Sequence, residues 1–332
     1  WWCYERASLP QNMIPEEIIQ YLKSNATFVS GQKLSQHLKI SRAAVWKYVH
    51  ELRESGYRIE AVPHRGYRLK FVPDKLLPWE IRAGLATRVL GHEVFCYDTL
   101  PSTMDEAFRL AEGNQCREGA LVCAESQTRG RGRMGRTWFS PKGKGIYASL
   151  VLKPFLAPSE VSWITFVAAI AVCEGIRQTT GLAAAIKWPN DVLIKRKKVA
   201  GILTEMNAEV DRVHFVVVGL GLNVNIDKAH LPPQATSLRM ELGGKVSRVL
   251  FLQAVLKQME HWYGCLLERR FTPVLERWKE LSVTLGRRIR ISEHHKAIEG
   301  KAVDLSDDGG LIVLNSDGDL IKKMTGDVEF LD

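Results

Sequence analysis

Strand-like and helix-like segments alternate along the middle of the chain, and this alternation constrains the fold more than any other feature of the sequence. Between residue 77 and about residue 267 we predict β-strands at 92–97, 120–124, 146–152, 200–206 and 213–218. Two long segments, 159–179 and 246–267, have the apolar spacing of amphipathic helices. Alternation of this kind predicts a mixed α+β domain.

Prolines mark the N-terminal boundary of this region. Pro73 and Pro78 punctuate the connection, so we place a linker near residues 71–77. A chain of 332 residues is long enough for several compact domains. We predict three, at residues 13–72, 77–283 and 285–332. Residues 1–12 resemble neither a signal peptide nor a helix, and we assign no role to them.

The composition is that of a soluble globular protein, with 45% hydrophobic and 25% charged residues. It excludes a disordered chain, a collagen and a small disulfide scaffold. The longest weakly polar stretch, near residues 161–173, is far shorter than the roughly 20 apolar residues that cross a bilayer, so we expect no membrane span. Six cysteines without a C-x-x-C pair predict reduced thiols in a cytoplasmic protein: Cys3, Cys96, Cys116, Cys123, Cys173 and Cys265.

The first seventy residues have the pattern of a winged helix-turn-helix. Three helices are predicted, at residues 15–24, 31–38 and 41–54. Ser41 is a natural N-cap for the third helix, and only a brief turn separates that helix from the second. Two short β runs, at 57–59 and 67–69, form the predicted wing.

Basic residues are concentrated in this first domain. Residues 1–72 carry 11 basic and 6 acidic side chains, in a chain whose net charge is +9. Together with the helix-turn-helix and the wing, this excess predicts DNA binding, and the alternative is solvated charge on a domain used for regulation or oligomerisation. The side chains predicted to approach the major groove or the DNA backbone are Ser41, Arg42, Lys47, Arg53 and Arg65. Trp46 and Tyr48 are expected in the core, because aromatic residues at helical spacing are usually buried.

The most informative segment runs from Gln127 to Lys144. Residues 127–138 read Gln-Thr-Arg-Gly-Arg-Gly-Arg-Met-Gly-Arg-Thr-Trp, and the whole segment carries six positive charges and no acid. Glycines let the backbone approach a ligand closely, and arginines offer forked donors to carboxylate and phosphate. The alternative is a disordered RGG-like nucleic-acid tail, but this segment lies between two predicted strands. We therefore predict that residues 127–138, the arginine loop, bind anions.

A second cluster is Lys187-Trp-Pro-Asn-Asp191. The Trp-Pro-Asn turn is expected to fix Lys187 and Asp191 facing a cleft, although a hairpin turn with a chance ion pair has the same pattern. Residues 195–197 are interpreted as a solvated turn. Lys198 adjoins a strand, and Gly201 permits the close approach of a ligand.

A third segment, Gly219-Leu-Gly221, lacks the further glycine of a dinucleotide-binding site, so we reject a Rossmann site. Three motifs of this region, taken in order, closely resemble those of the biotin–protein ligase family. They are the arginine loop, the Lys187–Asp191 motif and the segment from Gly219 to Asn225, which contains Asn223. The resemblance covers residues 77–330. With the N-terminal domain it extends to the bifunctional form, a biotin ligase that also represses biotin operons.

The resemblance implies a fold and a reaction. The fold is α+β and multidomain, with an N-terminal winged helix-turn-helix, a central class II synthetase-like catalytic domain and a C-terminal SH3-like β-barrel, whose β runs are predicted at 288–291, 297–303, 310–314 and 320–324. The reaction joins the carboxylate of biotin to the α-phosphate of ATP, with Mg²⁺. Biotin then passes from biotinyl-5′-AMP to a lysine of a biotin carboxyl carrier domain. That carrier, operator DNA and a second copy of the chain in a ligand-promoted homodimer are the implied partners.

The resemblance also implies site residues. Similar ligases hold the biotin head with a Ser-Thr-Asn motif and a glutamine, here Ser102-Thr103-Met104 and Gln127, so a methionine replaces an amide that could donate or accept. Arg133 is the first candidate to counter the biotin carboxylate and the α-phosphate. Further implied cations are Arg136, Lys187 and Lys198, of which Lys198 lies nearest the biotin carboxylate. Arg131 and Gly201 belong to the biotin site, and Trp138 forms an apolar lid. Asp191 and Asn223 hold the adenylate or Mg²⁺, with Mg²⁺ near Asp191 and no metal cage of protein ligands.

Two other functions fit part of the sequence. One is a DNA-binding biotin sensor without ligase activity, which needs neither the arginine loop nor the Lys187–Asp191 motif. The other is a related lipoate ligase, which the arginine loop disfavours. The C-terminal residues 287–332 carry 7 basic and 10 acidic side chains, and this leaves a structural cap and a docking surface for the acceptor as open interpretations.

Overall fold

The structure of the protein is a computed structural model, which describes residues 14–293 and 296–332. The predictions for residues 1–12, for Cys3 and for Met13 as the start of the first domain lie outside the described residues. The chain forms two compact units, which divide between Asp74 and Lys75. Residues 285–332 lie in the second unit.

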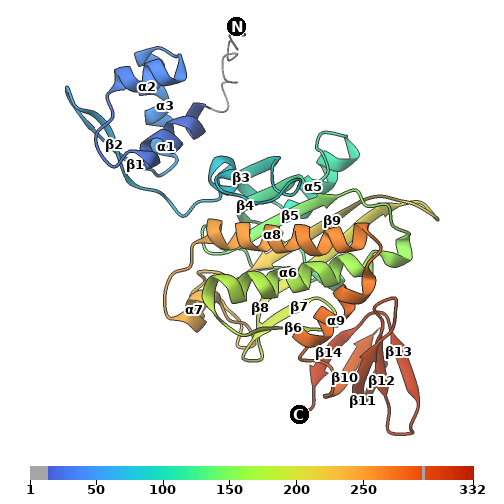
Figure 1. Ribbon diagram of the computed structural model, residues 1–332. Helices are drawn as coiled ribbons and strands as arrows, with labels where there is room; N and C mark the ends of the chain where they lie inside the picture. The colour runs from blue at the N-terminus through green and yellow to red at the C-terminus, as the bar shows by residue number, and fades with distance from the viewer. Residues whose placement is uncertain (1–13, 294–295) are drawn as a thin grey trace. The chain divides into compact units, whose positions relative to one another are not determined.

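Three helices and a hairpin build the first unit (Figure 1): α1 Ile14–Ser24, α2 Gly31–Leu38, α3 Arg42–Glu54, β1 Arg58–Val62 and β2 Gly66–Phe71. The helices bury one apolar face each, through residues such as Ile18, Leu34 and Val49. Ser41 caps α3 by accepting the Ala44 N–H at 3.1 Å. These elements follow the winged helix-turn-helix pattern that the sequence predicts.

The aromatic residues of α3 do not both lie where they are expected. Tyr48 is half-buried, but Trp46 is 62% exposed, so its predicted place in the core is wrong. The buried face of α3 is already filled by Val45, Val49 and Leu52. Trp46 directly follows Val45 and so does not occupy a position of the buried apolar spacing, and its side chain points away from this face.

A seven-stranded mixed sheet forms the centre of the second unit. Its strands are β3 Val94–Leu100, β4 Leu121–Gln127, β5 Ile146–Leu152, β6 Ala184–Lys187, β7 Asp191–Ile194, β8 Lys197–Ala208 and β9 Val213–Leu222. Their order is β3-β4-β5-β9-β8-β7-β6. Only β3 and β4 pair in parallel, and every other neighbour is antiparallel. This strand order brings segments that are distant in the sequence side by side in one sheet.

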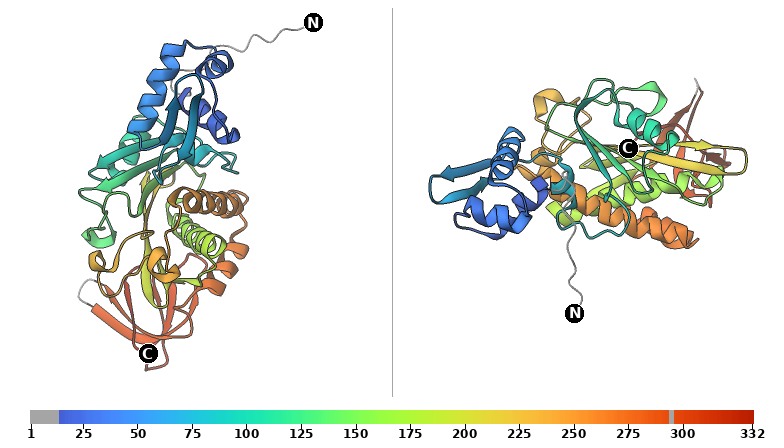
Figure 2. Two further views of the ribbon diagram at one scale, coloured as in Figure 1. Left: turned by 90° about the vertical axis from the view of Figure 1, so that its left-hand side faces the viewer. Right: turned by 90° about the horizontal axis from the view of Figure 1, so that it is seen from above.

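Helices cover both faces of this sheet (Figure 2). The long pair α6 Ser162–Thr180 and α8 Arg248–Leu267 lies side by side on one face, together with α9 Phe271–Leu281. On the other face, α5 Thr103–Glu112 packs through Met104, Ala107 and Leu110 against alternate residues of the strands. Two short helices, α4 Pro78–Arg82 and α7 Leu238–Leu242, also belong to this unit.

The helix α6 is long and apolar enough, by length and composition, to be a candidate membrane span. Most of its residues are buried inside the protein, between the sheet, α8 and α9. It is therefore not the amphipathic helix that we predict from the sequence, because neighbours enclose it on almost every side. An apolar helix of this kind is expected at the centre of a large core.

The C-terminal part is a five-stranded antiparallel sheet. Its strands are β10 Arg288–Glu293, β11 Lys296–Leu305, β12 Leu311–Leu314, β13 Leu320–Lys323 and β14 Asp327–Phe330, in the order β13-β12-β11-β10-β14. The sheet shares one apolar core with the rest of the unit. Trp188 Nε1 donates to the Gly309 carbonyl at 3.2 Å, and the Ser162 hydroxyl donates to the Asp308 carbonyl at 2.9 Å. The sheet is thus attached directly beside the Lys187–Asp191 motif.

Candidate functional site

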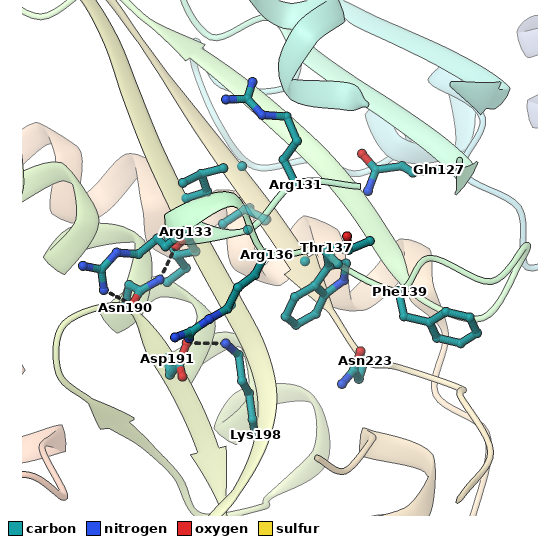
Figure 3. A pocket seen from close by; sticks show the side chains of 18 of the residues that line it. Gln127, Arg131, Arg133, Arg136, Thr137, Phe139, Asn190, Asp191, Lys198 and Asn223 are labelled. Carbon is teal, nitrogen blue, oxygen red and sulfur yellow. Dashed lines mark hydrogen bonds and ion pairs between the residues drawn. The ribbon is translucent and has the colours of Figure 1, made fainter. Parts of the chain in front are cut away.

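A cavity of about 250 Å³ opens between the arginine loop and the strands β8 and β9. Figure 3 shows how side chains from distant segments converge on it. The predicted ligase residues that line the cavity are Thr103, Gln127, Arg131, Arg133, Arg136, Trp138, Asp191, Lys198, Gly201 and Asn223. Two predicted residues, Ser102 and Lys187, lie outside the lining.

The arginine loop has a defined backbone. Arg131 and Thr137 face each other in a β-bridge, and the Gly132 N–H donates to the Arg136 carbonyl at 2.7 Å. At the tip of the loop, Met134 adopts a φ of 54°, in the left-handed region. These backbone hydrogen bonds hold the loop as a hairpin, so its arginines project from a preformed frame.

Carboxylates hold two of the loop arginines. Arg131 donates to Asp105 at 2.8 Å and to Glu205 at 2.5 Å, from opposite sides of its guanidinium. Arg136 donates both terminal nitrogens to Asp327, the first residue of β14. The C-terminal sheet therefore contributes directly to the position of the loop.

Arg133 is the most enclosed arginine of the loop. One terminal nitrogen donates to the Asn190 side-chain oxygen at 2.9 Å, and the other donates to the Thr325 hydroxyl at 3.0 Å. Burial lowers the pKa of Arg133, because desolvation disfavours the charged form. Both hydrogen-bond partners are neutral, and the nearest carboxylates, those of Asp191 and Asp327, act on the guanidinium through space.

Glycines form the floor of the cavity. A Cβ atom at Gly201 would lie 2.8 Å from the indole of Trp138, and one at Gly221 would lie 2.5 Å from it. The indole therefore rests on the sheet in a space that only glycine leaves open. Trp138 was expected to form a lid over the ligand, whereas in this structure it lies against the floor. Among the described residues, its buried indole N–H has no hydrogen-bond partner.

A chain of polar groups forms the end of the cavity near α5. The Gln127 side-chain oxygen accepts the Thr103 N–H at 2.8 Å, and the Gln127 amide donates to the Ser140 hydroxyl at 2.9 Å. The Ser149 hydroxyl donates to Thr103 Oγ1 at 2.9 Å. Within the described residues, the Ser102 hydroxyl is buried without a partner. This unpartnered hydroxyl lies next in the chain to Thr103, which lines the cavity.

Met104 lines the cavity and is buried at the start of α5. Its Sδ atom would lie 2.6 Å from a Cβ atom at Gly219. The thioether thus fills the gap above a glycine of β9. Its role in this structure is to shape the cavity wall.

The Lys187–Asp191 motif connects the antiparallel strands β6 and β7, which pair Lys187 directly with Asp191. Asp191 lines the cavity, and its carboxylate lies 2.6 Å from the Lys198 ammonium. Lys187 lies beside the cavity, with its ammonium 5.5 Å from the centre of the Phe330 ring. Burial lowers the pKa of Lys187, because the ammonium is partly removed from water.

Two further predicted residues have partners that the sequence did not indicate. The amide of Asn223 donates to the Thr236 carbonyl at 3.1 Å. Lys195 was expected in a solvated turn, and 75% of its side chain is exposed, with its ammonium 3.1 Å from the carboxylate of Glu241. With these contacts Asn223 still lines the cavity, and Lys195 is still exposed to solvent.

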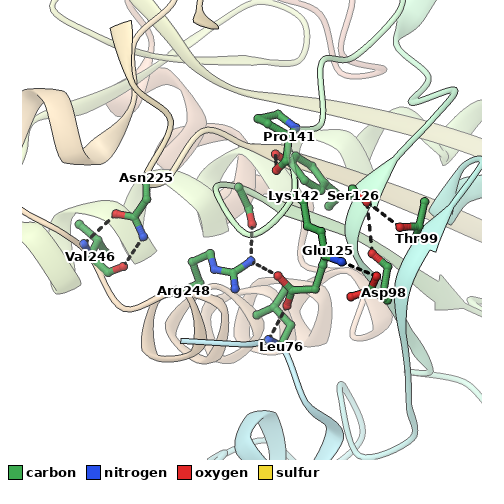
Figure 4. A network of polar contacts seen from close by, with 12 residues as sticks. Leu76, Asp98, Thr99, Glu125, Ser126, Pro141, Lys142, Asn225, Val246 and Arg248 are labelled. Carbon is green, nitrogen blue, oxygen red and sulfur yellow. Dashed lines mark hydrogen bonds and ion pairs between the residues drawn. The ribbon is translucent and has the colours of Figure 1, made fainter. Parts of the chain in front are cut away.

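A buried ion pair between β4 and α8 was not predicted from the sequence (Figure 4). Arg248 of α8 donates to Glu125 of β4 at 2.8 Å, and both side chains are almost fully buried. Glu125 also accepts the Leu76 N–H at 2.8 Å, and Arg248 also donates to the Gly145 carbonyl at 3.2 Å. This network fixes the strand that leads into Gln127. Its partners are too far apart in sequence for spacing to reveal them.

The predicted DNA-contacting residues are spread over the first unit. Arg42 and Lys47 are exposed on α3, and Ser41 caps that helix. Arg53 donates from two nitrogens to the Ile59 carbonyl, so it ties the end of α3 to β1. Arg65 lies at the turn of the hairpin, with its guanidinium 4.3 Å from the centre of the Phe28 ring. Of the predicted residues, Arg42 and Lys47 are therefore the most direct candidates for contact with DNA.

Three family models match the chain. They are an HTH domain at residues 16–68, the biotin/lipoate A/B protein ligase family at 96–223 and the biotin protein ligase C-terminal domain at 284–331. These matched segments follow the helix-turn-helix, the cavity with its arginine loop, and the five-stranded sheet.

Known relatives extend over nearly the whole chain. The bifunctional ligase/repressor BirA of Bacillus subtilis is 42% identical over 307 residues, which cover 91% of this chain and 94% of that protein. BirA of Escherichia coli is 28% identical over 326 residues, which cover 96% of this chain and 98% of that protein. The solved biotin protein ligase of Aquifex aeolicus in complex with biotin and ATP matches 72% of this chain and 98% of its own, at 29% identity and a TM-score of 0.61. The chain therefore belongs to the biotin/lipoate A/B protein ligase family, among its bifunctional ligase/repressor members.

Proposed function

We propose that this protein is an ATP-dependent biotin–protein ligase that also represses biotin genes. In the first step the biotin carboxylate attacks the α-phosphorus of ATP, and pyrophosphate leaves. In the second step the ε-amine of a carrier lysine attacks the acyl carbon of biotinyl-5′-AMP, and AMP leaves. Both nucleophiles come from substrates, so the enzyme needs to orient them and to stabilise charge.

The observation that carries this proposal is the composition of the cavity. One end has the hydrogen-bonding groups of Thr103 and Gln127, and the other has the cations Arg133, Arg136 and Lys198. A ligand with a neutral polar head and a carboxylate tail fits this cavity. Its head would lie at the hydrogen-bonding end, and its tail would meet a nucleotide phosphate among the cations. A sensor that only binds biotin needs no second anion site.

Each residue has a proposed part in the first step. Ser102, Thr103 and Gln127 bind the biotin head, and Arg131 and Gly201 border that site. Arg133 faces the carboxylate and the α-phosphate, where two anions must meet and charge develops. Lys198 is proposed to lie nearest the biotin carboxylate. The remaining phosphate and adenylate contacts are proposed for Arg136, Trp138, Lys187, Asp191 and Asn223.

Mg²⁺ is proposed to enter with ATP. Its chemistry would be to neutralise phosphate charge during the transfer. Among the residues that line the cavity, Asp191 supplies a carboxylate of the oxygen type that Mg²⁺ prefers, and no larger set of protein ligands is required when water and phosphate complete the shell.

The first unit is proposed to bind operator DNA as part of a cytoplasmic, ligand-promoted homodimer. Two helix-turn-helix units held together engage two half-sites at once, which raises affinity without new base contacts. We propose that biotinyl-5′-AMP is the signal for this dimer. The five-stranded C-terminal sheet is proposed to be an SH3-like barrel, which caps the arginine loop.

The test of ligation is incubation of the whole protein with biotin, ATP and Mg²⁺. We expect release of pyrophosphate and, after addition of a biotin carboxyl carrier domain, biotin on one lysine. Lipoate in place of biotin serves as the control substrate. Biotin binding without pyrophosphate release would support the sensor instead, and preference for lipoate would support the other ligase.

The test of repression is the affinity for DNA from upstream of biotin genes at fixed salt. We expect much tighter binding with biotin plus ATP than without either ligand, and weaker binding at higher salt. Deletion of residues 1–72 is expected to abolish DNA binding and to leave adenylation largely intact. Equal affinity of the apo and adenylate-bound protein would contradict regulation by the intermediate.

A further inference from the structure

One face of α3 is exposed and contains an unexpected tryptophan. The residues of this face are Arg42, Ala43, Trp46, Lys47 and His50, all of which are exposed. Residues four positions apart lie one above the other on a helix, so these five side chains form one continuous surface. The opposite face contains the buried residues of the helix and faces the core.

Trp46 is held in place although it is exposed. Its ring stacks on that of His50, with centroids 5.7 Å apart and planes only 4° from parallel. This pairing restricts the indole to the surface above the second turn of α3. A large apolar ring fixed in solvent contributes little to the core of a domain, whereas at an interface it offers a large contact area at a small entropic cost.

The surroundings of Trp46 indicate a polyanionic partner. Arg42 precedes it by one turn and Lys47 follows it directly. The first turn of α3 reads Arg-Ala-Ala-Val and contains no carboxylate, so the positive end of the helix dipole adds to the same surface. The acidic residues of the helix, Glu51 and Glu54, follow in its last turns, where Glu51 lies 3.8 Å from the Lys47 ammonium and Glu54 lies 3.5 Å from the His50 ring. Arg42 is therefore the cation of this surface that lies farthest from a carboxylate of the helix. Any polyanion gains from this charge pattern, and among polyanions the helix-turn-helix that contains α3 favours DNA.

An apolar group among cations has a specific use in the major groove. Lysine and arginine contact phosphates of any sequence, whereas apolar side chains distinguish thymine through its C5 methyl group. We propose that Trp46 contacts a thymine methyl group and is a residue that sets the DNA sequence preference of this protein. The proposal rests on the DNA-binding function proposed above for the first unit. Arg42 and Lys47 then supply affinity, and Trp46 supplies selectivity.

The experiment removes a single methyl group from the DNA. Full-length wild-type protein, with biotin and ATP, selects duplexes from a random pool, and each thymine of the selected sequence is then replaced by deoxyuridine. Binding is measured at fixed salt for the wild-type protein and for Trp46→Ala. At one thymine in each half-site, we expect the wild type to lose about fourfold in affinity, which corresponds to the burial of one methyl group. Trp46→Ala is expected to bind both duplexes equally.

Matched variants separate the contributions. Trp46→Phe keeps an aromatic ring and is expected to retain part of the discrimination. Lys47→Ala is expected to weaken binding to selected and random DNA by the same factor and to reduce the salt slope by about one. Far-UV circular dichroism and thermal unfolding of full-length Trp46→Ala, compared with the wild type, show whether the first unit remains folded, and adenylation shows the same for the second unit.

Three results would count against one or the other of the two proposals. If the wild type selects no sequence and binds all DNA alike, the DNA-reading function of the first unit fails. If the wild type selects a sequence but Trp46→Ala shows the same losses on every thymine replacement, only the role of Trp46 fails. Equal weakening of Trp46→Ala on selected and random DNA also overturns that role, because Trp46 would then add affinity without selectivity.

Discussion

Asp327 accepts hydrogen bonds from both terminal nitrogens of Arg136, and so joins the C-terminal sheet to the arginine loop. Two residues earlier, the Thr325 hydroxyl accepts a hydrogen bond from Arg133 at 3.0 Å. A short stretch of the C-terminal sheet thus holds two arginines of the loop. This sheet is therefore part of the frame of the cavity.

Asp327→Asn is expected to slow adenylation by up to about tenfold, through a loss of order in the loop. The pair is largely exposed, so the loss is expected to be well below that for a buried charged pair. Asp317→Asn, in the turn between β12 and β13, is the matched control and is expected to have no effect. The measurement is kcat/KM for ATP from pyrophosphate release. Equal rates for the two variants would show that the contact does not position the loop.

Arg133→Ala is expected to slow adenylation by roughly 100-fold or more, because one preorganised donor to the developing charge is lost. The fold is expected to remain intact, since the partners of Arg133 are the side chains of Asn190 and Thr325, which can bind water instead. Lys195→Ala removes a mostly exposed cation and is expected to keep activity within about twofold. Near-normal adenylation by Arg133→Ala at saturating substrate would contradict its assignment.

Met104→Asn tests whether the departure from the family motif affects biotin binding. Met104 is buried and fills space beside Gly219, so its role is expected to be one of shape. We predict a change in biotin affinity of less than about 1.4 kcal/mol, a factor of ten, measured by calorimetric titration. A larger gain in affinity would show that the methionine weakens binding.

Local patterns in the sequence predicted much of the fold, and for a physical reason. The limits of α2 and β5 agree with the predicted 31–38 and 146–152, because capping, apolar spacing and glycines act over a few residues. The helix α5 was not predicted from the sequence, because Ser102–Met104 has the pattern of a ligand motif and the same residues also start the helix. Strand β14 was also not predicted, although it positions the arginine loop.

The cavity was predictable as a set of motifs but not as an arrangement. Motifs identify Arg133, Lys198 and Gln127, and the structure brings these residues together. Contacts between distant segments are not contained in any local pattern. The Glu125–Arg248 pair joins residues that are 123 positions apart, and the exposure of Trp46 depends on which face of α3 the small core can cover.

The buried Glu125–Arg248 pair makes a sharp prediction on stability. Glu125→Gln leaves the Arg248 guanidinium buried without its charged partner, and the free energy of unfolding is expected to fall by about 3 to 5 kcal/mol. The exposed pair Arg290–Glu299 is the matched control, and Glu299→Gln is expected to cost less than about 1 kcal/mol. Urea unfolding of the full chain measures both. Similar losses would show that burial does not govern the contribution of this pair.

The lowered pKa of Lys187 predicts how adenylation depends on pH. Burial disfavours the ammonium, so the proton leaves Lys187 at a pH below the ordinary lysine value of about 10.4. A neutral lysine cannot neutralise phosphate. The profile of kcat/KM for ATP, which reports on the free enzyme, is therefore expected to fall on its alkaline side below that value. Lys187→Arg keeps its charge and is expected to move the fall to higher pH.

The pH dependence of stability distinguishes this loss of activity from unfolding. Activity falls with rising pH, whereas the contribution of Lys187 to the free energy of unfolding changes in the opposite direction. Between the lowered pKa of Lys187 in the folded protein and its ordinary value in the unfolded chain, the unfolded state binds more protons. The contribution of Lys187 to the free energy of unfolding therefore rises with pH over the range in which activity falls. Pyrophosphate release without a carrier domain keeps the acceptor lysine out of the measurement, and thermal unfolding is followed at each pH. Identical alkaline profiles of wild type and Lys187→Arg would show that the Lys187 ammonium takes no part in binding ATP.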